Sequence, residues 1–150
     1  MFPAEDRTPR CLCHLACTHG PFLIPFGITT FYAGGDKLDE IHPVGEGTPR
    51  YRDFLFSNIT ARGAKDAGSI TGLCEMPVEN LTFSNVHIQA ATGFTCTNAT
   101  AITFLDTVID TAQGPALILR NASEIDAARL RTRTPHAGVP LVQTEAVTGP

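Results

Sequence analysis

The residues best suited to metal chemistry in this 150-residue chain lie close together near its N-terminus. Three thiols and two imidazoles share the stretch CLCHLACTH: Cys11, Cys13, His14, Cys17 and His19. Thiolates and imidazoles at short spacing are typical zinc ligands. Structural zinc sites usually pair two such groups, and no second one follows, since Cys74 and Cys96 stand alone. We therefore expect a thiol-rich leader with no metal site and no cofactor.

A second group of residues suited to chemistry is acidic. Asp36, Asp39 and Glu40 cluster in a glycine-rich stretch, and Asp53 follows. Paired carboxylates can act as general acid and general base. Such a cluster is more often a solvated loop, and catalysis would require a geometry that sequence does not give. We favour the loop and keep Asp36, Asp39 and Glu40 as the weaker, catalytic alternative.

Four asparagines stand in Asn-X-Ser/Thr tripeptides: Asn58, Asn80, Asn98 and Asn121. In a eukaryotic secretory route such tripeptides are glycosylation acceptors. Asparagine and threonine are also common at turns. Because these asparagines recur at repeat positions, we favour a structural role in turns.

Composition excludes several classes of protein. Apolar residues make up 43% of the chain and charged residues 17%, which is typical of a packed domain. The net charge is -4 and no run of Lys and Arg stands out, so nucleic acid is not an expected partner. No apolar run approaches the roughly 18 residues of a membrane span. The first ten residues carry two acids and two prolines, unlike a secretory signal, and the localisation stays open.

An internal repeat must position these residues. Segments 54–59, 81–86 and 102–107 resemble one another, and 125–130 is a weaker copy. One track of apolar residues has spacings of 27, 21 and 23 residues: Phe56, Phe83, Phe104 and Ala127. A second has spacings of 24, 23 and 24 residues: Ile70, Phe94, Leu117 and Leu141. Two tracks with one common period indicate a solenoid.

Within each copy, apolar and polar residues alternate, which predicts strands with one buried face. The segment 123–133 contains helix formers but keeps the register of the strand repeat, so we expect a strand there. A β-sandwich would also give many short strands, but not two tracks at a constant period. The sequence therefore predicts an all-β parallel β-helix of about four to five coils. Asn58, Asn85 and Asp106 should form a polar ladder at one turn.

Several short motifs also occur in a characteristic order: Thr48-Pro49, Tyr51, Arg52-Asp53, Ser57-Asn58, Gly72-Leu73-Cys74-Glu75-Met76-Pro77 and Val78-Glu79-Asn80. With them, residues 28–145 resemble the C-terminal coils of family 28 glycoside hydrolases, the polygalacturonases, and bacterial exo-type members above all. Cys74 stands where the family usually has proline. The resemblance implies a right-handed β-helix and inverting hydrolysis of α-1,4-galacturonosyl bonds in pectin. It also implies a secreted or periplasmic location.

The same resemblance sets expectations for the site. Inverting chemistry needs two carboxyl groups roughly 6.5–9.5 Å apart. The family supplies them from Asn-Thr-Asp and Asp-Asp motifs, next to Gly-His-Gly and Arg-Ile-Lys motifs, and none of these occurs here. We therefore expect a C-terminal fragment: residues 1–25 of unknown structure, then a partial β-helix over 26–150. Ile28-Thr29-Thr30-Phe31-Tyr32 resembles the strand end that carries the family's substrate-contacting tyrosine, which implies that role for Tyr32.

Two functions follow from this sequence. The first is a polygalacturonase-related protein that acts on or binds pectin, its own activity left open. The alternative is a non-catalytic carbohydrate-binding or structural module that oligomerises. Arg129, Arg131 and Arg133 alternate along one strand and could pair with pectin carboxylates, unless they form a merely solvated face. A β-helix cut in its middle exposes an open coil end, so we expect residues 22–26 to cap it or the chain to form a homo-oligomer through it.

Overall fold

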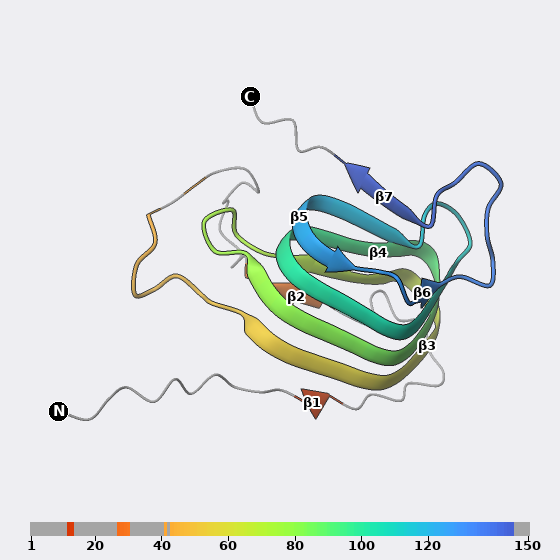
Figure 1. Ribbon diagram of the computed structural model, residues 1–150, viewed down its shortest axis with the longest axis horizontal. Coiled ribbons are helices and arrows are strands. Elements are labelled where there is room, and N and C mark those ends of the chain that lie inside the picture. The colour runs from red at the N-terminus through yellow and green to blue at the C-terminus, as the bar shows by residue number, and fades with distance from the viewer. Residues whose placement is uncertain (1–11, 14–26, 31–40, 42, 146–150) are drawn as a thin grey trace.

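The computed structural model describes residues 12–13, 27–30, 41 and 43–145. In this part of the chain the fold is an all-β parallel solenoid of about four turns, with no helix and hence none that could span a membrane. Figure 1 shows the long strands as curved ribbons stacked on one another. The strands are β1 (Leu12–Cys13), β2 (Gly27–Thr29), β3 (Arg52–Thr71), β4 (Val78–Thr111), β5 (Leu117–Asp126), β6 (Leu130–Arg131) and β7 (Val142–Glu145).

The strands of the described residues pair in parallel throughout, in the order β1-β3-β4-β5-β7, with β2 on β3 and β6 on β4. The predicted β-helix is therefore confirmed. The segment 123–133 contains strand rather than helix, as its register indicated. Strand β4 is long enough to wind through more than one turn of the solenoid. Just after its end, the backbone N–H of Ala112 donates to the carbonyl of Ala90, one turn earlier in β4, at 3.0 Å.

A column of phenylalanines forms the centre of the core. Phe56 pairs in register with Phe83, and their stacked rings lie 5.2 Å apart. The ring of Phe83 stacks on that of Phe104 at 5.1 Å, and Phe94 meets both edge-on. Thr103 pairs with Asp126, so the next residue of each turn, Phe104 and Ala127, occupies the equivalent position. These contacts confirm the first predicted track. Stacking of the rings buries apolar area that a single turn could not bury alone.

The second predicted track is wrong in its register. Phe94 pairs with Leu117 as expected, but Ile70 pairs with Cys96, and Leu117 pairs with Val142 rather than Leu141. At Ile70 the offset between turns is 26 residues (70 to 96), two more than the 24 (70 to 94) that the track assumed, and at Leu117 it is 25 (117 to 142), one more than the assumed 24. A displacement of two residues keeps an apolar side chain inside, since strand side chains alternate with period two.

Asparagines occupy the bends between strand segments. Asn58, Asn85 and Asp106 have φ angles of 56°, 53° and 45°, a left-handed conformation that asparagine tolerates well. The side-chain amide of Asn85 donates to the side-chain oxygen of Asn58 at 2.7 Å. A second bend carries Asn98 and Asn121, joined in the same way at 2.6 Å. The predicted polar ladder is present for Asn58 and Asn85, with Asp106 at the equivalent bend.

The same bends explain the four Asn-X-Ser/Thr tripeptides. Asn58, Asn80, Asn98 and Asn121 all have positive φ, which confirms their structural role in turns. Asn98 is 2% exposed, and its amide donates to the Gly72 carbonyl at 2.9 Å. That side chain cannot accept a glycan in the folded chain.

The two ends of the solenoid differ. At the first end, β1 pairs with β3 through Leu12 and Leu55, and β2 pairs with β3 through Ile28 and Ile70. The proposed cap, residues 22–26, lies outside the described residues and stays a prediction. At the other end, β7 pairs only with residues 117–120 of β5.

Candidate ligand-binding groove

Most side chains expected to do chemistry fall outside the described residues. This holds for Tyr32, Asp36, Asp39 and Glu40, and for the thiols and imidazoles near the N-terminus, of which only the backbone of Cys13 is described. Within the described ranges, no group of three or more His, Cys, Asp and Glu side chains could hold a metal ion. The roles implied for these residues stay predictions.

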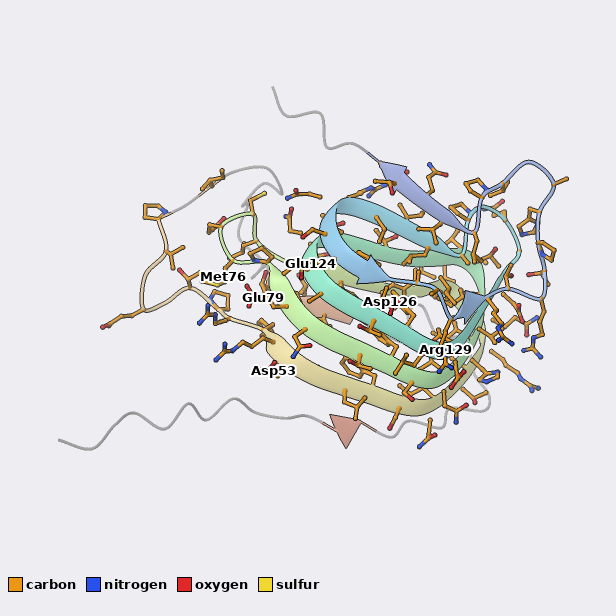
Figure 2. All side chains as sticks on the ribbon, in the orientation of Figure 1. Asp53, Met76, Glu79, Glu124, Asp126 and Arg129 are labelled. Carbon is orange, nitrogen blue, oxygen red and sulfur yellow. The ribbon has the colours of Figure 1, made fainter. Side chains whose placement is uncertain are left out.

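Asp53 is described, and it is a bend residue. Its φ is 62°, its carboxylate accepts a hydrogen bond from the Asn80 side chain, and it lies 3.6 Å from the Arg52 Nε. Figure 2 shows Asp53 at the start of β3, beside Glu79 at the start of β4. These contacts repeat the ladder of the other bends, which favours a structural role over a catalytic one.

Arg129 and Arg131 flank the buried Leu130, and both are exposed. Arg131 pairs with Val108 of β4, so β6 continues the outer surface of the solenoid. Only Arg131 of the three arginines lies in a strand, since Arg129 precedes β6 in a turn and Arg133 follows it in a bend, so the expected run of alternating arginines along one strand is not formed. Figure 2 shows Arg129 at the last turn, next to β6.

A groove of about 510 Å³ lies on the side of the solenoid. Thr60 pairs with His87, and Val108 with Arg131, so the residues around it come from four successive turns. Three steps between neighbouring strands amount to about 14 Å. The lining is mostly polar: Thr60, Ala61, Arg62, Asn85, His87, Ile88, Gln89, Asp110 and Arg133.

Asp110 and Arg133 are joined in this groove by two hydrogen bonds and an ion pair. The Asp110 carboxylate, in a residue 8% exposed, accepts the backbone N–H of Arg133 at 2.6 Å and its Nε–H at 3.1 Å. The Thr132 hydroxyl lies 3.5 Å from the same carboxylate. The Arg133 side chain is nevertheless 70% exposed. Asp110 therefore fixes one side of the guanidinium, and its remaining N–H groups make no hydrogen bond within the described residues.

The other polar side chains complete a donor-rich surface. Arg62 on β3 is exposed and His87 on β4 is half-buried. Asn85 and Gln89 add two side-chain amides. Asp110 is the single carboxylate among the described lining residues, against two guanidinium groups, so the groove carries positive charge.

Sequence reasoning found one of these residues and missed the others. Arg133 belonged to the alternating arginines. Arg62, His87 and Asp110 are far apart in the sequence, and only the register between turns brings them together. The one signal for Asp110 was its place in a strand otherwise rich in apolar residues.

The two described thiols have different environments. Cys96 is 0% exposed, and burial raises the pKa of its thiol from 9.0 to about 12. A thiol protonated in this way is unreactive. Cys74 is half-buried and donates to the Asn98 side-chain oxygen at 3.6 Å. Neither lines the groove.

The fold and the groove together define a parallel β-solenoid with a polar, cationic lateral surface. No family model, curated protein or solved structure matches this chain. Function is therefore inferred from the groove and from the motifs in the sequence.

Proposed function

We propose that this chain binds an acidic polysaccharide of the polygalacturonate class in the lateral groove. The observation that carries the proposal is the pair Asp110 and Arg133, which holds a guanidinium group in place on the surface while most of its side chain stays exposed. Planar guanidinium groups bind carboxylates through two parallel hydrogen bonds. A guanidinium held in advance loses less conformational freedom when it binds.

The shape of the groove supports an extended ligand. It crosses four turns, about 14 Å along the solenoid, with Arg62 at one end and Arg133 at the other. A polyuronate carries a carboxylate on every sugar, so two such groups can meet the two arginines. Asn85, His87 and Gln89 lie between them and can hydrogen-bond sugar hydroxyls.

Binding without hydrolysis is favoured by the distribution of acids. Inverting hydrolysis needs one carboxylic acid and one free carboxylate on opposite sides of the scissile bond. The described lining contains one carboxylate, Asp110, and it is occupied by Arg133. The groove is thus better suited to holding a polyuronate than to cleaving it.

Hydrolysis of polygalacturonate is the second candidate, favoured by the ordered motifs between Thr48 and Asn80. A reducing-end assay on polygalacturonic acid tests it. Turnover at an enzyme-like rate would support hydrolysis, and Asp36, Asp39, Glu40 and Asp53 would then be the first acids to replace, along with Tyr32.

Calorimetric titration of the chain with oligogalacturonates tests the binding proposal. Arg62→Gln combined with Arg133→Gln should weaken binding more than about tenfold, because a hydrogen bond to a charged group contributes about 1.5–3 kcal/mol. Arg50→Gln, an exposed arginine outside the groove, is the matched control. Equal affinity of the double variant and the control, or equal affinity for a neutral galactan, would contradict the proposal.

A further inference from the structure

We propose that His136 is a positioning residue for the groove, which keeps Arg133 in place although it does not line the groove itself. The proposal rests on the polysaccharide binding proposed above and concerns how that binding site is held together. The residues involved belong to the connecting segment, residues 132–141, which joins β6 to β7. Figure 1 shows this segment as a blue loop beside the solenoid.

The connecting segment cannot continue the strand ladder of β6. Residues 130 and 131 pair with residues 107 and 108 of β4, an offset of 23 (130 less 107). The same offset would set Pro135 opposite Ala112, next to the carbonyl of Thr111. Proline has no backbone N–H to donate to this carbonyl. Because Thr111 is only 4% exposed, its carbonyl needs another donor, and a buried carbonyl without one would be unfavourable.

Two side chains of the connecting segment supply this hydrogen bonding. The Thr134 hydroxyl donates to the Thr111 carbonyl at 3.1 Å, and His136 Nε2 lies 2.9 Å from the same oxygen. A carbonyl oxygen can only accept, so Nε2 carries the hydrogen and donates it. The Thr111 hydroxyl donates to the Gly114 carbonyl at 3.1 Å, and at 3.3 Å from Nε2 it can accept the same hydrogen.

Arg133 lies between two anchors to the end of β4. Its backbone N–H and Nε–H donate to Asp110, whereas Thr134 and His136, one and three positions later, bond the next residue, Thr111. Consecutive residues of β4 thus hold the chain at Arg133 and just beyond it. Release of the later anchor would let the connecting segment leave β4, and the guanidinium would lose part of its alignment before binding.

Packing contributes little to holding the connecting segment. A cavity of about 70 Å³ lies between it and the solenoid, and the residues around this cavity include Thr111, Thr132, Thr134, His136, Val139 and Leu141. Atoms that line a cavity lack part of the close contacts of a packed core. The hydrogen bonds to Thr111, rather than apolar packing, therefore determine where the segment lies.

Calorimetric titration with an oligogalacturonate tests the role of His136. His136→Phe keeps an aromatic ring but removes the donor, and it should weaken binding about three- to tenfold. His136→Gln restores a side-chain N–H near the position of Nε2 and should retain the affinity within about twofold. Val139→Ala, a change in the same segment at a side chain 37% exposed, is the control and should bind like the wild type.

Double variants distinguish positioning of Arg133 from a general loss of stability. In an Arg133→Gln background, His136→Phe should cause no further loss of affinity, because the group that it positions is absent. In an Arg62→Gln background it should cause its full loss, since Arg62 lies on β3 at the other end of the groove. Equal losses in the two backgrounds would overturn the proposal, as would a His136→Gln variant that binds no better than His136→Phe.

The Nε–H signal of Arg133 in an NMR spectrum is a readout that needs no ligand. The hydrogen bond to Asp110 should slow exchange of this proton in the wild type and in His136→Gln, and His136→Phe should speed it several-fold. Circular dichroism establishes that each variant is folded. If the wild-type chain binds no oligogalacturonate, the proposed function fails, and this signal alone decides whether His136 positions Arg133. An exchange rate unchanged in His136→Phe would overturn that role.

Discussion

Asp110 and Arg133, from neighbouring turns of the solenoid, are joined twice, through the backbone N–H of Arg133 at 2.6 Å and through its Nε–H at 3.1 Å. The first contact fixes the chain where it leaves β6, and the second orients the guanidinium. One carboxylate thus connects the packing of the last turn to the charge of the groove.

Asp110→Asn should lower both the stability of the chain and its affinity for oligogalacturonate. An amide keeps the shape of the side chain but removes the charge that holds Arg133. We expect a loss of about 1 kcal/mol in the free energy of unfolding, measured in urea, and several-fold weaker binding of oligogalacturonate. Asp106→Asn is the matched control, since this exposed carboxylate sits at a bend with positive φ, where asparagine is well suited. Similar affinities for the two variants would argue against a positioning role for Asp110.

Phe83→Ala should destabilise the chain most among single changes in the core. Phe83 is 1% exposed, and its ring contacts Phe56, Phe94 and Phe104. Loss of a buried phenylalanine costs about 3–5 kcal/mol. Leu55→Ala, at a position 41% exposed on the same strand as Phe56, should cost less than about 1 kcal/mol. Comparable costs at the two positions, measured by urea denaturation, would be inconsistent with the stacked core.

Two substitutions of Asn58 distinguish the contribution of its backbone conformation to stability from that of its hydrogen bond. Asn58→Ala removes the acceptor for the Asn85 amide and keeps a Cβ at a φ of 56° without the polar side chain that lets asparagine tolerate this conformation, so we expect a loss of about 2 kcal/mol. Asn58→Gly removes the same acceptor but tolerates this φ, so it should cost less. Thermal unfolding of the two variants measures the difference. A glycine variant less stable than the alanine variant would count against a left-handed bend.

Cys96 should be inert in the folded chain. With a pKa of about 12, its thiol is protonated at pH 8, and iodoacetamide should label it only after unfolding. Cys74 should react faster, and peptide mass mapping distinguishes the two. Because burial raises the pKa above its ordinary value of 9.0, the contribution of this thiol to stability is complete below pH 9 and declines as the pH rises toward 12. Cys96→Val should lack this decline, and rapid labelling of native Cys96 would refute its burial.

The sequence predicted the fold well because a solenoid repeats its pattern along the chain. The spacing of Phe56, Phe83 and Phe104 alone indicates stacked turns, and each ring lies where the first track placed it. The second track failed at Ile70, because inward positions recur every two residues: Phe94 and Cys96 are both buried, and the partner of Ile70 is Cys96. Periodicity therefore predicts which face a side chain occupies better than it predicts its partner.

The groove could not be predicted in the same way. Arg62 and Asp110 are 48 positions apart (110 less 62), and they share a groove only because two turns and one bulge intervene. The bends were easier to predict, because asparagine is a residue type that tolerates positive φ and it recurs in the sequence at Asn58, Asn85 and Asn98. Contacts between turns depend on exact register, which composition and alternation do not specify.

The most direct test of polysaccharide binding in the groove is a titration of the ¹⁵N-labelled chain with an oligogalacturonate, followed by NMR. Binding in the groove predicts that the largest shifts occur at Arg62, His87, Gln89 and Arg133, with little change at the bend residues Asn80 and Asn121. Shifts confined to residues outside the groove, or none at saturating ligand, would contradict it.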